Sequence, residues 1–90
     1  MRWRVVSGQA LHIRVWEDEF IVYGSLSGNT HLLGPVAAHV LSRLQEAPSD
    51  AATLAESLPP LLQANFDGEL VPEIEHLLAD LGSLELIERA

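Results

Sequence analysis

The chain has 90 residues, a formal net charge of −8 and no cysteine. This length predicts one domain over residues 1–90, with one modest core and little space for an enclosed active site. The absence of cysteine excludes disulfides, thiolate nucleophiles and thiolate metal sites. Because the sequence shows neither a signal-peptide pattern nor an apolar run long enough to cross a bilayer, we expect a cytoplasmic protein with no membrane partner.

Positive charge is unevenly placed along the chain. All five cationic residues are arginine, and none of them lies between residues 44 and 88, where carboxylates recur throughout. Nucleic-acid binding draws on cations that neutralise phosphates, so the distribution argues against a nucleic-acid partner. The negative charge suits either solubility or the attraction of a basic partner.

The first third of the chain predicts three strands. Residues 10–16 alternate between apolar and polar side chains, which is the period of a half-buried strand. A charged connection over 17–19 leads to residues 20–23, which are β-branched and aromatic and typical of a second strand. A turn with two glycines, over 24–28, precedes a short third strand over 29–33. Connections this short favour an antiparallel meander whose third strand is an edge.

After residue 33 the apolar residues change to helical spacing. Gly34 and Pro35 suit the N-cap and the first turn of a helix, and apolar residues follow at positions 36, 40, 41 and 44. We expect this helix to end near residue 47, because Pro48 follows. Ser49 then predicts the cap of a second, shorter helix that extends to about Leu58.

The last third predicts a loop over 61–68 and the clearest helix of the chain, over 69–81. The expected apolar anchors of the loop are Leu61, Leu62 and Phe66. The helix carries apolar residues at positions 74, 77, 78 and 81, with Gly82 suited to its C-terminal cap. A brief extended tail over 84–87 completes the chain. The predicted class is therefore α+β, with a three-stranded antiparallel meander followed by three α-helices.

Residues 27–35 (SGNTHLLGP), followed at once by a helix, resemble the SG-x-THLL-[DN]-P core of PqqD-like peptide chaperones. The branch that they resemble most is the HPr-rel-A system PqqD family. Residues 16–23 (WEDEFIVY) and the Leu-Gly pair at 81–82 match as well, so the similarity covers nearly the whole chain. Two features depart from the family pattern. Gly34 replaces the usual Asp or Asn, and the end reads LGSLELI over 81–87 instead of the shorter LGLI.

This resemblance implies a winged helix-turn-helix-like domain of the type that recognises ribosomally made, modified peptides (a RiPP recognition element). It implies that a precursor (leader) peptide adds as a strand beside the third strand, in a groove completed by the third helix. The peptide would then be presented to a modifying enzyme, or to an HPr-kinase-related protein. The expected peptide-binding residues are Asn29, Thr30, His31, Leu32, Leu33, Leu70, Glu73, Ile74, Leu77 and Leu81.

The residues themselves are compatible with strand addition. Positions 29–33 contain no lysine, proline or carboxylate, the residues that protect an exposed strand from further pairing. About four added hydrogen bonds at roughly 1 kcal/mol each are too few for micromolar binding, which needs about 8 kcal/mol, so apolar side chains must also enter a groove. The apolar residues of the third helix fit its wall, and they fit ordinary core packing too. Glu73 shares a polar helix face with Glu69, His76 and Asp80, which is either solvated or attractive to a partner carrying arginine or lysine.

Patterns of catalytic sites are missing from the sequence. The four histidines lack zinc-ligand spacing, and the segment 24–28 has leucine where a nucleophile elbow has serine. We therefore expect no enzyme activity, no cofactor and no metal site, and no oligomeric state is required. Two alternative functions fit the element order: a regulatory subunit of a kinase-like complex, and a winged-helix DNA-binding regulator, which the lack of cations in the last two helices disfavours.

Overall fold

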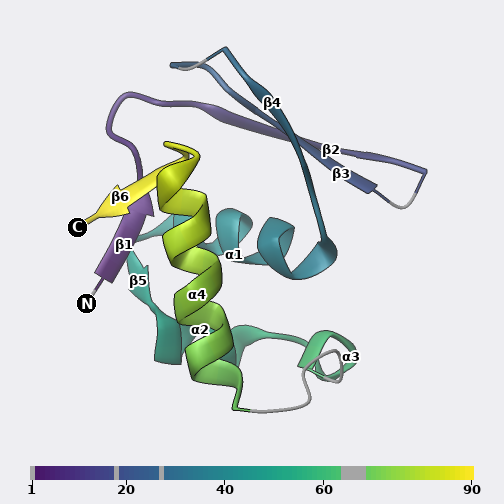
Figure 1. Ribbon diagram of the computed structural model, residues 1–90, viewed down its shortest axis with the longest axis vertical. Helices are drawn as coiled ribbons and strands as arrows, with labels where there is room; N and C mark the ends of the chain where they lie inside the picture. The colour runs from purple at the N-terminus through teal and green to yellow at the C-terminus, as the bar shows by residue number, and fades with distance from the viewer. Residues whose placement is uncertain (1, 18, 27, 64–68) are drawn as a thin grey trace.

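The computed structural model describes residues 2–17, 19–26, 28–63 and 69–90. Its strands form two separate three-stranded antiparallel sheets (Figure 1). The larger sheet has the order β2 (Leu11–Trp16), β3 (Glu19–Gly24) and β4 (Thr30–Leu33). The smaller sheet has the order β5 (Ser49–Asp50), β1 (Arg2–Val5) and β6 (Ile87–Arg89).

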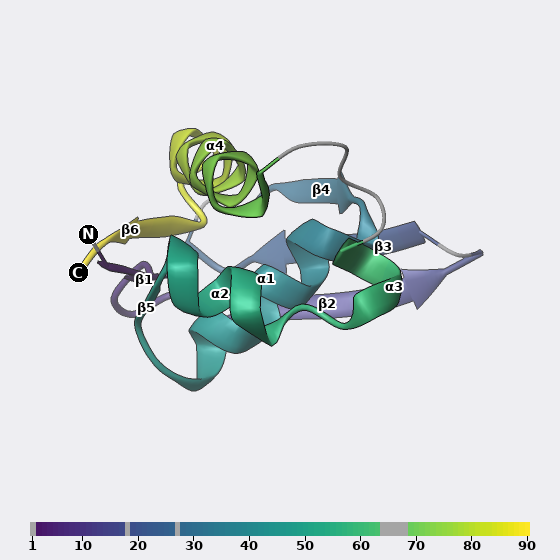
Figure 2. The ribbon, with the colours of Figure 1, turned by 90° about the horizontal axis from the view of Figure 1, so that it is seen from below.

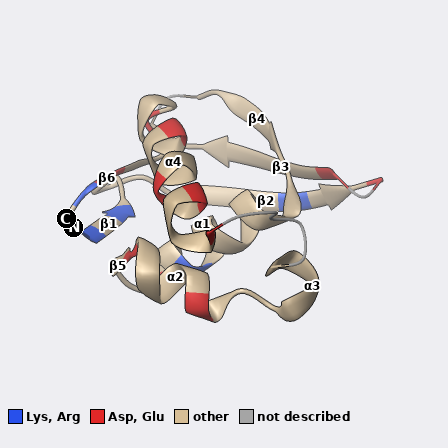
Figure 3. Ribbon diagram, turned by 60° about the horizontal axis from the view of Figure 1, so that its bottom comes forward, with Lys and Arg blue, Asp and Glu red and all other residues tan. Residues whose placement is uncertain are grey.

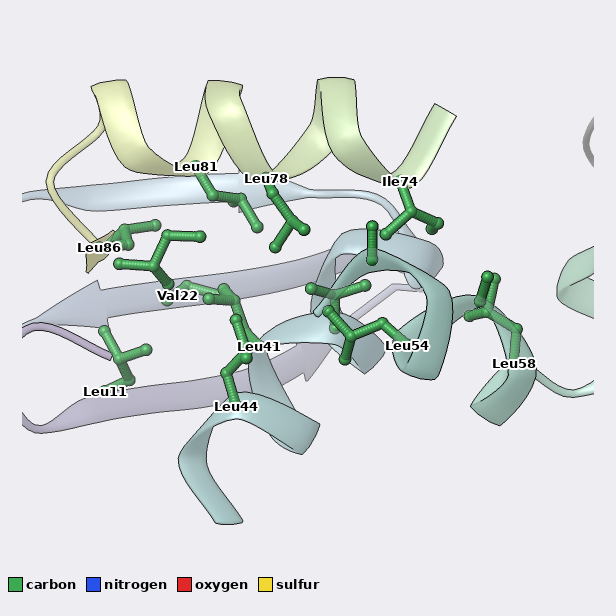
Figure 4. Packing of buried hydrophobic residues seen from close by; sticks show 14 residues of the cluster. Leu11, Val22, Leu41, Leu44, Leu54, Leu58, Ile74, Leu78, Leu81 and Leu86 are labelled. Carbon is green, nitrogen blue, oxygen red and sulfur yellow. The ribbon is translucent and has the colours of Figure 1, made fainter. Parts of the chain in front are cut away.

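Four helices appear in the described part of the chain. They are α1 (Pro35–Glu46), α2 (Ala51–Ser57), α3 (Pro60–Gln63) and α4 (Leu70–Ser83). The core lies between one face of the larger sheet and the apolar stripes of α1, α2 and α4 (Figure 4). Its largest fully buried side chains are Leu41, Leu54, Ile74, Leu78, Leu81, Leu86, Val22 and Val40.

The predicted α+β class and the antiparallel pairing of the three predicted strands are confirmed. Residue 13 pairs with 22, and residue 22 pairs with 31, so the three strands follow one another across the sheet. Their observed ends differ from the predicted ones by no more than one residue. Because β3 lies in the middle, β4 is an edge of this sheet, as expected.

The predicted order of three strands followed by three helices is incomplete, because it omits the smaller sheet. Trp3 of β1 pairs with Ser49 on one side and with Arg89 on the other. These strands have 4, 2 and 3 residues, too few for an alternation to be visible in the sequence. The extended tail predicted over 84–87 forms a turn first, with Glu85 at a φ of 63°, and the strand begins at Ile87.

The predicted start of the first helix is confirmed. Gly34 is the N-cap, with an extended backbone at φ −75° and ψ 172°, and Pro35 opens α1. The cap has no side-chain hydrogen bond, since glycine offers none. This junction joins β4 directly to α1, which brings the edge strand and the start of the helix together.

The predicted cap of the second helix is wrong by one residue. Asp50 is the N-cap of α2, and its Oδ1 accepts a hydrogen bond from the Thr53 backbone N–H at 2.8 Å. This backbone bond lowers the pKa of the Asp50 carboxyl. Ser49 instead pairs with β1, so its backbone belongs to the smaller sheet.

Two further details of the last third differ from the prediction. The loop predicted over 61–68 begins within α3, and Leu61 is 86% exposed, so it anchors nothing. Leu62 does pack against the core, whereas Phe66 lies outside the described residues. Gly82 lies inside α4 and not at its cap; a Cβ there would lie 3.1 Å from Cζ3 of Trp3, so the glycine permits close packing of the tryptophan.

Candidate peptide-binding edge and cleft

The orientation of the β4 backbone follows from two hydrogen bonds at the end of the hairpins. Gly24 N–H donates to the Asn29 carbonyl at 3.2 Å, and Ser25 N–H donates to the Ala10 carbonyl at 3.0 Å. Gly24 therefore faces β4, and Ser25 faces β2. Along an antiparallel strand, the backbone groups of successive residues point alternately to one neighbouring strand and to the other. Gly24, Val22 and Phe20 of β3 therefore bond to β4.

This alternation leaves half of the β4 backbone facing outward. His31 and Leu33 are the partners in register with the β3 residues that face β4, so their N–H and C=O groups bond to β3. The N–H and C=O groups of Thr30 and Leu32 point the other way. In the part of the chain that the structure describes, no strand lies beyond β4 on that side.

The side chains of β4 alternate between the two faces of the sheet. Leu33 packs against the core, and His31 on the same face is half-buried. The His31 Nε2 is buried and has no hydrogen-bond partner among the described residues. Thr30 and Leu32 lie on the outer face, where Leu32 is 66% exposed. The strand thus offers both backbone groups and a large apolar side chain at the surface.

A cleft of about 330 Å³ opens where β4 ends. One wall is the start of α1, from Gly34 to Ala37, which continues directly from β4. The other wall is the outer side of α4, with Glu73, His76, Leu77 and Asp80. Figure 2 shows β4 as the strand of the larger sheet on the α4 side. A strand added to β4 would therefore have this cleft beside it.

The chemistry of the cleft is apolar at its base and acidic at its rim. Leu77 and Val36 are half-buried and pack against the core from opposite walls. Glu73 and Asp80 supply carboxylates, and among the described residues no arginine or lysine lines the cleft. Acidic positions recur along α4, which carries no arginine or lysine (Figure 3). Asp80 Oδ2 lies 3.9 Å from His76 Nε2, but both side chains are largely exposed, so this contact leaves the carboxylate accessible.

The structure separates the predicted residues of α4 into three groups. Glu73 and Leu77 line the cleft. Ile74 and Leu81 are 0% and 1% exposed and point into the core (Figure 4), so we leave them out of the candidate site. Leu70 lines another cleft, toward α2. Helical spacing places all of these residues on adjoining faces, and only the packing of α4 decides which of them remain accessible.

The wall formed by the start of α1 was missed by sequence reasoning. Its signal was present in the direct junction of the third predicted strand with the first helix, which leaves no room for a loop.

Two larger clefts of about 490 Å³ each lie elsewhere along α4, and neither is lined by β4 or by the start of α1. The described residues contain no group of three or more His, Asp or Glu that could hold a metal ion. None of the described helices has the length and apolar character of a membrane span.

Comparisons with known proteins place the fold. No family model matches the chain, and no curated protein matches it. Among solved structures, the chain is similar to TbiB1 in complex with the TbiA(beta) leader peptide. The TM-score is 0.65 at 17% identity, and the match covers 94% of each chain. At this identity the likeness shows that this chain and TbiB1 share a fold.

Proposed function

We propose that this protein is a non-catalytic, PqqD-like peptide chaperone that binds a precursor (leader) peptide and presents it to a modifying enzyme. The peptide adds as a strand to β4 and places side chains in the cleft between α1 and α4. One observation carries this proposal: the backbone groups of Thr30 and Leu32 face a side of β4 on which no described strand lies, and Gly34, directly after β4, lines the cleft. The fold shared with TbiB1, which was solved with a leader peptide, supports a peptide as the partner.

The backbone edge and the cleft contribute in different ways. Two residues with outward N–H and C=O groups offer four hydrogen bonds, about 4 kcal/mol in total at roughly 1 kcal/mol each. Micromolar affinity requires about 8 kcal/mol, so the remainder must come from side chains. One or two apolar groups against Leu77 and Val36 would supply about 1.5–3 kcal/mol each. The edge thus provides affinity for any extended chain, and the cleft provides selectivity.

The acidic rim favours a peptide with arginine or lysine. The aliphatic stem of such a residue packs on an apolar surface such as Leu77, while its charged end reaches Glu73 or Asp80 at the rim. An HPr-kinase-related partner stays a prediction of the family resemblance alone.

A peptide titration with two variants tests the proposal. Overlapping synthetic peptides from the open reading frames beside the gene are added to ¹⁵N-labelled protein, and amide shifts are followed. We expect saturable shifts in Thr30–Leu33 and in residues 34–37.

Thr30→Pro removes one outward N–H at the first residue of an edge strand, where proline is tolerated, and should weaken binding at least fivefold. Thr30→Ala keeps the N–H and should bind as the unchanged protein does. Absence of saturable binding, or equal affinity of the two variants, would contradict strand addition.

A further inference from the structure

The outer face of the larger sheet carries a row of three side chains that ends at the open edge. Arg14, Ile21 and Leu32 are in register across β2, β3 and β4. Ile21 is half-buried, and Leu32 is 66% exposed. A residue of a guest strand paired with Leu32 would place its side chain on this same face, about 5.5 Å away between Cα atoms, and would extend the row.

The two faces of the sheet offer a guest strand different chemistry. Guest residues on either side of the one paired with Leu32 point to the inner face, and the one paired with Leu33 lies next to the cleft with Glu73 and Asp80. A basic side chain is therefore favoured on the inner face, next to the carboxylates of the cleft. On the outer face an aliphatic side chain covers Leu32.

We infer that the outer face is a second recognition surface, with Leu32 as the residue that selects an aliphatic side chain in the peptide. The inference rests on the proposed function and specifies its substrate class: an extended segment in which an aliphatic residue has a basic residue directly beside it in the chain. This alternation also fixes the register. A slip by one residue would move the basic side chain to the outer face, away from the carboxylates, and would move the aliphatic side chain away from Leu32.

Selection from random peptides tests the alternation. A displayed library of random dodecapeptides is panned against the full chain, and the enriched sequences are aligned. We expect an aliphatic residue with a basic residue on one side of it and no such requirement on the other side; in the outcomes below, this pair is the alternation that is tested. Enriched peptides without this alternation would overturn the inference and leave the proposed function standing. A library in which nothing is enriched would overturn both.

A matched pair of variants tests the role of Leu32 directly. Leu32→Thr keeps a residue that suits a strand and removes the exposed apolar surface. Val15→Thr is the control, because Val15 is 64% exposed on β2, at the other edge of the same sheet. With the most enriched dodecapeptide, we expect Leu32→Thr to raise Kd about tenfold, as partial loss of a buried leucine contact implies. Val15→Thr should stay within twofold. Equal affinities for the two variants, with amide shifts in β4 retained, would refute the role of Leu32 and spare strand addition.

Discussion

The two sheets of this protein use the same antiparallel pairing to join different parts of the chain. The smaller sheet joins the beginning, the middle and the end of the chain, and its outer strands have only 2 and 3 residues. It is further held by the Arg4–Glu88 ion pair at 2.7 Å and by Arg89, which lies 5.9 Å from the ring centre of Trp3. The larger sheet is built from consecutive strands, and its β2–β3 hairpin extends past the helices (Figure 1). The smaller sheet thus joins distant parts of the chain, whereas no described strand pairs with the outer side of β4 in the larger sheet.

The buried side chain of Leu86 connects the two sheets. It is 0% exposed, it precedes β6, and its Cδ2 lies 3.3 Å from where a Cβ on Gly24 would stand. Gln9 Nε2 fixes the same segment by donating to the carbonyls of Glu85 and Leu86 at 3.2 and 3.1 Å. The end of β3 at Gly24 therefore packs against the segment that leads into the smaller sheet.

The largest expected effect comes from breaking this connection. Leu86→Ala leaves a cavity between the sheets and should lower the free energy of unfolding by about 2–5 kcal/mol, measured by urea denaturation. Leu84→Ala is the control, since Leu84 is 37% exposed and should cost far less. If both variants lost equal stability, Leu86 would not couple the sheets.

A smaller loss of stability is expected when a methyl group is added at Gly24, the residue of the larger sheet that lies against Leu86. In Gly24→Ala the new Cβ would meet Gln9 Oε1 at 2.6 Å as well as Leu86, so the side chain of Gln9 must move. We expect a loss of about 1–3 kcal/mol in the free energy of unfolding. Gly34→Ala is the comparison: nothing lies within 4 Å of a Cβ there, so only the poorer N-cap preference of alanine should cost stability, about 0.5–1 kcal/mol. A loss in Gly34→Ala as large as that in Gly24→Ala would speak against the close contact.

The next prediction concerns the acidic cleft beside β4 and removes one of its carboxylate charges. Glu73→Gln should weaken binding of a basic peptide about two- to fivefold, and the remaining affinity should depend less on salt, because exposed charge attraction is screened. Glu75→Gln removes the same charge from α4, but Glu75 lines a different cleft and should leave affinity unchanged. Isothermal titration at low and high salt measures both. Equal losses in the two variants would indicate a general effect of net charge.

The smallest effect concerns Asp50, at the edge of the smaller sheet. Its carboxyl has a lowered pKa in the folded protein because of the Thr53 backbone hydrogen bond. Its contribution to stability is thus fully present above the unfolded pKa of about 4 and is lost as pH falls through the folded value. Asp50→Ser keeps a cap without a charge. The difference in Tm between the unchanged protein and this variant should shrink as pH falls from 6 to 3, and a constant difference would contradict the assignment.

The sequence predicts the larger sheet well because the strands that pair in it follow one another directly along the chain. The alternation over 10–16, the turn glycines and the short connections all lie within one stretch of chain, and the observed strand order and antiparallel pairing follow from them. The smaller sheet depends on pairing between Trp3 and residues 46 and 86 positions away, which no periodicity reveals. Strands of 2 to 4 residues also carry too few side chains to show a pattern.

The strand and the helix that form the candidate site were predictable from the sequence. Which of their side chains line the cleft was not. The strand over 29–33 and its edge position follow from the meander. The spacing of Ile74, Leu77, Leu78 and Leu81 predicts one apolar stripe, and the structure buries three of them while Leu77 borders the cleft. That division depends on how α4 meets α1, two segments that are distant in the sequence.

The described ends of the chain lie together on the smaller sheet, where Ala90 N–H donates to the Arg2 carbonyl at 2.9 Å. Figure 1 shows both ends away from the β4 edge. A fused enzyme or a surface linker attached at either end would therefore leave β4 open to solvent. Tethering a modifying enzyme at that point would hold it at high effective concentration near a captured substrate without blocking capture.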